Sequence, residues 1–336
     1  MSSDFIGTIR NMMERRHRIL AAPLVGYPGA TLTGTSVLEN LKDSRVQSET
    51  LIQLYKTYGF DILFPFMDLS VEAEALGLAI EFIEDGSPNV REHPVGSPED
   101  LLRLAIPEPS HAGRMNVFAD TIRRVKEATE KTEEAPFVAG YVASPFTLAG
   151  LLMGAENLAI NTLIEPQFCD LVIDFATKCV IPYAKALQDA GADMVVLLDP
   201  TAVLLSPNLY DTFARPSIER IAAELGVPSI LHVCGQTTPV MSNLAATKVA
   251  GLSLDSGVDI PSIMQLIPAE MVILGNINPV SIFLNGDPDA VDKETKKLMK
   301  HMMHHDNFII SSGCDLPVET PLKNIRSFAK AVGTIS

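Results

Sequence analysis

One histidine and two cysteines in this sequence have the residue types and the spacing of a zinc site. His232 and Cys234 lie in the run Ile-Leu-His-Val-Cys-Gly-Gln at residues 230–236, which is typical of a buried strand that runs into a turn. Because side chains alternate faces along a strand, these two residues point the same way. Cys314 follows a second apolar run, residues 308–312, and lies in a Gly-Cys turn. Neutral imidazole and thiolate are both good zinc ligands, so we expect one zinc ion to bridge the two strand ends.

This ligand set predicts a particular kind of zinc chemistry. Two thiolates and one neutral imidazole leave Zn²⁺ formally neutral, and a thiol that coordinates such an ion loses its proton. The resulting thiolate stays electron-rich and nucleophilic. Hydrolytic zinc sites more often use histidines and carboxylates, which leave the metal more electron-poor. The ligand set therefore favours alkyl transfer to sulfur over hydrolysis.

The other histidine and cysteine clusters fit structural roles better. His301, His304 and His305 end a predicted helix that leads into the last strand. That position lies at the N-terminal face of a barrel, where residues serve stability, and histidines at a helix C-terminus also suit the helix dipole. Cys169 and Cys179 lie inside another predicted helix, and we expect both to be buried core residues.

The elements that must position the zinc ligands are eight strand candidates that alternate with helices. Their continuous apolar character implies a parallel sheet that is buried on both faces. Eight such units predict an α/β fold, a single (β/α)8 TIM barrel over residues 1–336, with the active site at the C-terminal ends of the strands. An open doubly wound sheet is the competing fold, but no Gly-x-Gly-x-x-Gly turn follows the first strand. The expected strands are residues 19–26, 61–66, 137–142, 194–199, 229–234, 251–255, 271–275 and 308–312.

Two additions to the barrel are predicted. Residues 1–18 have the apolar spacing of an amphipathic helix, and we interpret its basic end, Arg15 to Arg18, as a solvated helix terminus. Residues 69–135, between the second and third strands, are too many for one crossover helix, and we expect an insertion that flanks the active site. The insertion should contain a hairpin, residues 79–83 with 90–93, and a helix near residues 114–130.

Composition restricts the classes of function. The chain has 336 residues, 47% of them hydrophobic and 20% charged, which suits a large soluble globular protein with a substantial core. Its formal net charge is -15 without a basic block, which argues against nucleic-acid binding. No apolar run reaches the roughly 18 residues that span a bilayer, and the N-terminus lacks the features of a signal peptide. We therefore expect a cytoplasmic protein without a membrane partner.

Polar residues near other strand ends complete the candidate site. Glu72 and Glu74 are candidates for an occasional zinc ligand or a proton acceptor, with a solvated loop face as the alternative. Asp199 and Asp255 are candidates for orienting His232 or for accepting a proton, with helix capping as the alternative. The residues expected to line a cofactor-binding pocket are Tyr27, Asp255, Asn276 and Asn278.

Several motifs resemble the uroporphyrinogen decarboxylase superfamily. Ser144-Pro-Phe-Thr-Leu-Ala-Gly150 is similar to its segment after the third strand, and Gly275-Asn-Ile-Asn-Pro279 to its loop after the seventh. Three further motifs resemble the cobamide-dependent methyltransferases within that superfamily: Val71-Glu-Ala-Glu-Ala-Leu-Gly77, Leu231-His-Val-Cys-Gly235 and Gly313-Cys-Asp-Leu-Pro317.

The resemblance implies an activity, a cofactor and a partner. That branch carries zinc on a His-x-Cys pair and a distant Cys, which fall here on His232, Cys234 and Cys314. It implies methyl transfer from a methylcobamide, carried by a corrinoid protein that docks at the C-terminal face of the barrel. The acceptor would be a small thiol such as coenzyme M, or tetrahydrofolate.

Other readings remain open. A corrinoid-independent methyltransferase of the methionine-synthase kind is one alternative, and a non-catalytic corrinoid-binding or metal-binding barrel is another. Porphyrin decarboxylation is disfavoured by the same resemblance. The decarboxylases open with an arginine-containing segment and lack the cysteine pair, whereas residues 21–28 contain no arginine.

Overall fold

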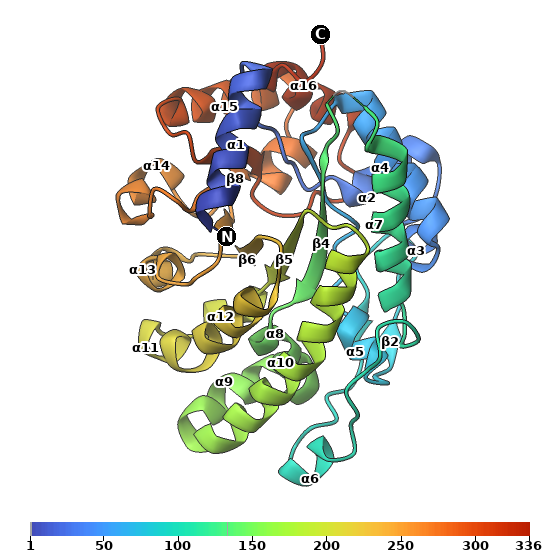
Figure 1. The fold of residues 1–336 in the computed structure, drawn as a ribbon, viewed down its shortest axis with the longest axis vertical. Helices are drawn as coiled ribbons and strands as arrows, with labels where there is room; N and C mark the ends of the chain where they lie inside the picture. Colours follow the sequence, from blue (N-terminus) through green and yellow to red (C-terminus); the bar gives the residue numbers. More distant parts are fainter. Residues whose placement is uncertain (1, 133) are drawn as a thin grey trace.

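The computed structural model describes residues 2–132 and 134–336, and it shows a parallel sheet curled into a barrel with helices around it (Figure 1). In the described chain, seven strands are hydrogen-bonded in the order β1-β4-β5-β6-β7-β8-β9, and each adjacent pair is parallel. The strands are β1 (Ile62–Leu63), β4 (Phe137–Ala143), β5 (Met194–Leu198), β6 (Ser229–Val233), β7 (Gly251–Leu254), β8 (Val272–Ile277) and β9 (Phe308–Ser312).

Residues 20–24 occupy the eighth place and close the barrel. Ala22 donates its backbone N–H to the carbonyl of Ile310 in β9 at 2.9 Å. On the other side, the N–H of Asp61, directly before β1, donates to the carbonyl of Ala21 at 2.9 Å. The predicted TIM-barrel fold is confirmed, with an irregular segment in place of one strand.

The predicted first strand, residues 19–26, is wrong in its extent. Only Ala21 forms a strand-type bridge, with Ile310. The N–H of Ala21 donates to the carboxylate of Asp61 at 2.6 Å, and Pro23 has no N–H to donate. A regular ladder therefore cannot continue through this segment, although it remains extended and buried.

The long helices expected from the sequence are present around the sheet, with ends shifted by a few residues. They include α4 (Ser44–Tyr58), α7 (Met115–Thr129), α10 (Pro166–Asp189), α12 (Arg215–Glu224), α15 (Pro288–Met302) and α16 (Leu322–Val332). Shorter helices lie between them. These are α2 (Gly26–Thr33), α3 (Val37–Lys42), α8 (Pro145–Met153), α9 (Ala155–Ile164), η1 (Pro200–Leu204), α11 (Pro207–Leu209), α13 (Met241–Ala245) and α14 (Ile260–Ile263). The sequence predicts two of these, near residues 238–247 and 261–266, and the structure has a short helix at each place.

Helix α1 (Ser2–Arg16) covers the N-terminal opening of the barrel. Its apolar residues Phe5, Ile9 and Met12 are buried in one cluster with inward-facing strand residues such as Ala139 and Met194. The expected amphipathic helix is confirmed. The barrel interior is therefore a packed core, and the open end is the one where the strands finish.

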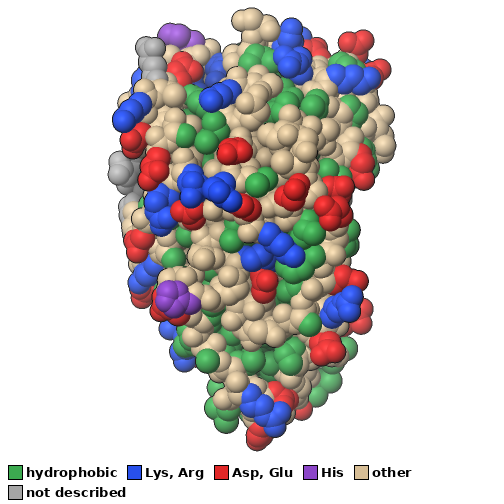
Figure 2. Space-filling model, turned by 90° about the vertical axis from the view of Figure 1, so that its right-hand side faces the viewer, with side chains coloured by type: hydrophobic (Ala, Val, Ile, Leu, Met, Phe, Trp, Pro, Cys, Tyr) green, Lys and Arg blue, Asp and Glu red, His purple; other side chains and the backbone are tan. Residues whose placement is uncertain are grey.

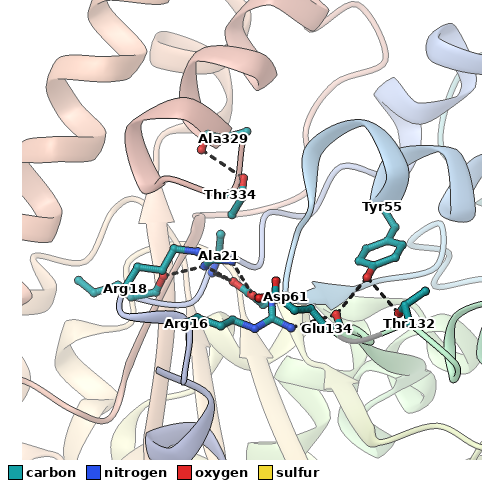
Figure 3. A network of polar contacts seen from close by, with 10 residues as sticks. Arg16, Arg18, Ala21, Tyr55, Asp61, Thr132, Glu134, Ala329 and Thr334 are labelled. Carbon is teal, nitrogen blue, oxygen red and sulfur yellow. Dashed lines mark hydrogen bonds and ion pairs between the residues drawn. The ribbon is translucent and has the colours of Figure 1, made fainter. Parts of the chain in front are cut away.

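The prediction of a solvated basic end holds for Arg15 and His17, which are exposed, and is wrong for Arg16 and Arg18, whose side chains are largely buried. Arg16 and Arg18 both pair with Asp61, whose side chain has no exposed surface (Figure 3). Arg18 donates to both carboxylate oxygens, at 2.6 and 2.9 Å, and Arg16 also donates to the carbonyl of Glu134 at 3.1 Å. A buried carboxylate requires such partners, and local sequence could not reveal that the two arginines face one.

The insertion between β1 and β4 contains α5 (Val71–Ala75), a hairpin of β2 (Ile80–Glu81) with β3 (Asn89–Val90), α6 (Pro98–Leu101) and α7. The predicted hairpin is confirmed, with shorter strands. Arg114 joins the start of α7 to the start of the insertion, because its guanidinium donates to Glu74 at 2.5 Å, to Ser70 at 3.0 Å and to Asp68, just before the insertion, at 2.6 Å. The insertion is thereby held beside the open end of the barrel.

The surface formed by α3, α4 and α7 carries interspersed acidic and basic side chains (Figure 2). Asp120 of α7, for example, pairs with both Arg123 and Arg124. None of the described helices is by itself long and apolar enough to cross a bilayer; α8 and α9 meet that criterion only together, and they are bent by 101°.

Candidate metal centre

His232, Cys234 and Cys314 converge at the open end of the barrel. His232 is in β6, Cys234 follows the same strand, and Cys314 lies two residues after β9. The Sγ atom of Cys234 lies 3.3 Å from His232 Nε2 and 3.6 Å from Cys314 Sγ. The Sγ atom of Cys314 lies 3.7 Å from His232 Nε2, so the three atoms form a triangle. Strand alternation had predicted the first pair, and barrel closure brings in the third residue.

The triangle has the dimensions of three corners of a zinc tetrahedron. With Zn–S near 2.3 Å and Zn–N near 2.0 Å, ideal geometry separates two sulfurs by about 3.8 Å and a sulfur from a nitrogen by about 3.5 Å. The observed distances of 3.3, 3.6 and 3.7 Å match those edges. In the described chain, no other group of three such side chains is close enough to hold a metal. The residues present therefore fit a zinc ion with one position left for another ligand.

Ser253 in β7 orients the histidine. Its Oγ lies 2.9 Å from His232 Nδ1, and His232 is almost fully buried. This contact leaves Nε2 directed at the two sulfurs, which is the usual arrangement around a metal-binding histidine. The expectation that Asp199 or Asp255 orients His232 is corrected. A serine inside the apolar run 251–254 was the available signal.

Asp255 shapes the turn after Cys234 instead. Its Oδ2 accepts the backbone N–H of Gly235 at 2.9 Å, and its Oδ1 accepts that of Gly257 at 3.0 Å. Gly235 has a φ of +83°, a conformation that favours glycine. Asp255 thus holds the Cys234 turn against the end of β7.

The two thiols share a charge when no cation lies between them. The pKa of Cys314 is lowered, chiefly by the hydrogen bond from the Cys234 thiol and further by His232. The pKa of Cys234 is raised because its thiol serves as that donor and because it is buried. The pair is therefore poised to lose protons to a metal cation, which would attract both sulfurs.

A cavity of about 450 Å³ opens onto the three ligands. Its walls are largely apolar, with Met67, Leu198 and Leu316 among them. Tyr27, one of the predicted pocket residues, lines it and donates its hydroxyl to the carbonyl of Met67 at 2.9 Å. Further polar lining comes from Ser87, Asn89 and Asp315, which the sequence analysis did not single out.

Two predicted acids are buried beside the cavity without lining it. Glu72 accepts the N–H of Ala143 at 2.7 Å, and burial raises the pKa of Glu72 to about 8. Asp199 accepts the hydroxyl of Thr147 at 2.8 Å, and burial raises the pKa of Asp199 to about 6. Each carboxyl has a second oxygen without a hydrogen-bond partner in the described chain. Glu74 is paired with Arg114.

Asn276 and Asn278 lie at a separate cavity of about 270 Å³, which His301 also lines. The side-chain amide of Asn276 donates to the carbonyls of Asp255 and Val258, at 2.8 and 2.6 Å. Asn278 accepts the N–H groups of the turn that follows it. Both asparagines support loops around the metal centre, and neither reaches the cavity of the ligands. Cys169 and Cys179 are buried in α10, as expected.

Tyr141 in β4 was not anticipated either. It is buried in the barrel interior, and its ring stacks on Phe64 with 5.8 Å between the ring centres. Burial raises the pKa of Tyr141, and so would negative charge on Asp315 and the two cysteines. Its hydroxyl therefore stays protonated beneath the site, and it has no hydrogen-bond partner in the described chain.

Comparisons with known proteins agree with this geometry. The family model described as uroporphyrinogen decarboxylase (URO-D) matches residues 24–335. A methylcobamide:CoM methyltransferase, MtbA, of Methanosarcina acetivorans is 29% identical over 94% of this chain and 96% of its own. A methylated-thiol–coenzyme M methyltransferase of Methanosarcina mazei is 28% identical over 86% of this chain and 77% of its own.

A solved structure supports the fold. The structure described as a methyltransferase from Methanosarcina mazei superimposes with a TM-score of 0.85 at 22% identity, and the match covers 94% of both chains. At 22% identity this likeness shows the shared fold alone, whereas the names of the relatives given above indicate methyltransferases.

Proposed function

The chain belongs to the uroporphyrinogen decarboxylase (URO-D) family, and on that premise we propose that it is a zinc-dependent methyltransferase. It moves a methyl group from a protein-bound methylcobamide to a small acceptor, of which a thiol such as coenzyme M is the first choice. The observation that carries the proposal is the convergence of His232, Cys234 and Cys314 at distances that match a zinc tetrahedron. Relatives along nearly the whole chain are methylcobamide:CoM methyltransferases.

The three ligands and their supports account for the role of the metal. Zinc held by two thiolates and one imidazole would keep a thiol acceptor deprotonated near neutral pH. Ser253 fixes the ring of His232, and Asp255 fixes the turn of Cys234, so the ligands are in place before a substrate arrives. Such preorganisation lowers the cost of bringing acceptor and donor together.

The cavity walls position the acceptor. Apolar residues exclude water from the sulfur, while the side chains of Ser87 and Asn89 offer hydrogen bonds to a polar tail. Among the described residues, neither lysine nor arginine lines this cavity. An anionic tail would thus be held by hydrogen-bond donors and by the partner that covers the opening.

The transfer itself is an in-line displacement. The acceptor sulfur, already without its proton, forms a bond to the methyl carbon while the cobalt–carbon bond breaks. The electron pair of that bond stays on the cobalt of the departing corrinoid. The roles of Glu72, Glu74 and Asp199 as proton acceptors stay predictions. Tyr27 lines the cavity of the three ligands, whereas Asp255, Asn276 and Asn278 do not, and a cofactor contact of any of the four stays a prediction.

Metal analysis combined with a methylcobalamin demethylation assay tests the proposal. Coenzyme M, homocysteine and tetrahydrofolate are offered in parallel, and we expect about one zinc per chain and the fastest turnover with a thiol. Cys314→Ala should lose most of the zinc and at least about 100-fold in turnover. Cys169→Ala, the same substitution in the buried part of α10, is the matched control and should keep both.

Three outcomes would contradict the proposal. Full turnover by zinc-free protein removes the metal from the mechanism. Unchanged turnover in Cys314→Ala removes this site. Turnover with a methylfolate donor but not with methylcobalamin would identify a corrinoid-independent enzyme of the methionine-synthase kind.

A further inference from the structure

Helix α9 exposes an unpartnered apolar face. Ile160, Leu163 and Ile164 are spaced so that they share one side of the helix, and their side chains are 53%, 73% and 67% exposed. The opposite side of α9 buries Leu158 and Thr162. Helix α9 therefore has apolar side chains on its outer face as well as on the face that packs against the core, unlike an ordinary surface helix, whose outer face is polar.

A second segment, η1, also exposes apolar side chains, and it lies beside the metal centre. Val203 and Leu204 are 43% and 50% exposed. Pro200, at the start of η1, lines the cavity of the metal ligands, and a Cβ placed on Gly235 would lie 3.3 Å from Val203. We call Ile160, Leu163, Ile164, Val203 and Leu204 the apolar shelf.

The two parts of the shelf are joined through α8. A Cβ placed on Gly150 of α8 would lie 3.2 Å from Thr201 of η1 and 3.6 Å from Ala155 of α9. Both segments follow the C-terminal ends of strands, and α9 lies at the end of the molecule opposite the C-terminus (Figure 1). The η1 part of the shelf therefore lies at the opening of the metal cavity, and α8 connects it with the first residue of α9.

Of the twelve large apolar side chains exposed in the described chain, five lie in α9 and η1. Leu266 and Met303 lie before β8 and β9, on the N-terminal side of the barrel. Residues 155–164 and 200–209 contain a single charged residue, Glu156, whereas 20% of the whole chain is charged. Depletion of charge is the mark of the core of a protein interface.

We infer that the apolar shelf is the docking surface for the protein that carries the methylated corrinoid. This inference rests on the proposed function. A cavity of about 450 Å³ cannot admit a corrinoid together with an acceptor, so the donor must stand over the opening. The carrier then covers the surface next to that opening, and the shelf borders it through Pro200 and Val203.

The chemistry of the shelf favours a protein over other occupants. In a chain with a net charge of -15, an area that carries almost no charge can be covered by a partner protein without burying unpaired charges. Helices that lie on membranes usually carry lysine or arginine on their polar face. Residues 155–164 and 200–209 contain neither.

Two methyl donors separate docking from chemistry. Leu163→Asp and Leu204→Asp are compared with Met303→Asp, a 62% exposed apolar residue at the other end of the barrel. Turnover is measured with free methylcobalamin and with a methylated corrinoid protein purified from Methanosarcina mazei. We expect the parent to prefer the protein-bound donor, and the two shelf variants to lose about 10-fold or more in kcat/KM for it. Turnover of free methylcobalamin should stay within about 2-fold in all variants.

Each other result overturns the inference in a recognisable way. A parent that shows no preference for the protein-bound donor, or shelf variants that match Met303→Asp, removes the docking role. Equal losses with both donors show that the shelf serves the barrel itself. If light scattering shows a dimer that Leu163→Asp dissociates while the kinetics stay unchanged, the occupant of the shelf is a second copy of the chain. If the parent binds lipid vesicles and Leu163→Asp does not, again with unchanged kinetics, the occupant is a lipid surface. A parent inactive with both donors refutes the proposed function, and the inference falls with it.

Discussion

Both ends of the barrel contain buried polar side chains, but these side chains have different kinds of partner at the two ends. At the N-terminal end, the carboxylate of Asp61 receives Arg16, Arg18 and the backbone N–H of Ala21 (Figure 3). At the C-terminal end, Cys234 and Cys314 face each other and His232. Charge is neutralised within the chain at the first end, whereas the second gathers ligands around a space for a cation.

The buried acids repeat this contrast. Glu72 and Asp199 each keep one oxygen without a partner in the described chain, and burial raises the pKa of both. Buried groups that lack partners cost stability, and proteins keep them where chemistry or binding needs them. The N-terminal end of the barrel therefore contributes to stability, and the C-terminal end, which we call the rim, holds the candidate site. This division is typical of TIM barrels.

The largest change in stability is expected from removing the buried carboxylate at the N-terminal end of the barrel. Asp61→Asn would leave Arg18 without a carboxylate partner and Arg16 with only the exposed Glu134, 3.9 Å away, and should lower the free energy of unfolding by about 3–5 kcal/mol. Urea unfolding measures the loss, and zinc content should not change. Asp306→Asn is the control, because its pair with Arg10 is exposed and should be worth less than about 1 kcal/mol. Loss of zinc in Asp61→Asn would show that the two ends are not independent.

An intermediate effect concerns a buried acid at the rim. The pKa of Glu72 is raised from its ordinary 4.5 to about 8, so the folded protein binds the extra proton between these values. The contribution of Glu72 to stability is therefore complete below pH about 4.5 and is lost as pH rises through about 8. Glu72→Gln keeps the acceptor for Ala143 and removes the titration. At pH 9 it should be more stable than the parent, relative to pH 5, by on the order of 2–4 kcal/mol.

Urea unfolding at several pH values checks this difference. Glu99→Gln, on the surface of α6, is a suitable control and should leave the pH profile as in the parent. Identical profiles for Glu72→Gln and the parent would mean that Glu72 is ionised in the folded protein at neutral pH, and the contrast with Asp61 would disappear.

The smallest change in stability is expected from a substitution next to the candidate metal ligands at the C-terminal end. Ser253→Ala removes the contact that holds His232 and should weaken zinc binding by about 10- to 100-fold, with little change in stability. Competition with a chromogenic chelator measures the affinity. Ser217→Ala, a buried serine of α12 that bonds its own helix, should bind zinc as the parent does. An unchanged affinity in Ser253→Ala would show that packing alone orients the histidine.

The sequence allowed most of the barrel and the three candidate metal ligands to be identified, because both depend on short-range patterns. Apolar runs identify buried strands, and a spacing of two places His232 and Cys234 on the same side of one strand. The same patterns failed at residues 19–26, where a carboxylate from elsewhere takes a backbone donor, and at Arg16 and Arg18, whose acidic partner is 43 or more residues away.

The role of Ser253 also escaped, since a single hydroxyl in an apolar strand has many possible partners. The sequence by itself thus determined which residues have metal-binding chemistry and which segments must be buried, because residue type and periodicity are local properties. Only the tertiary structure decided which of them meet. Closing the barrel sets Cys314 beside His232 and gives Asp61 its arginines, and those distances depend on the packing of the whole chain.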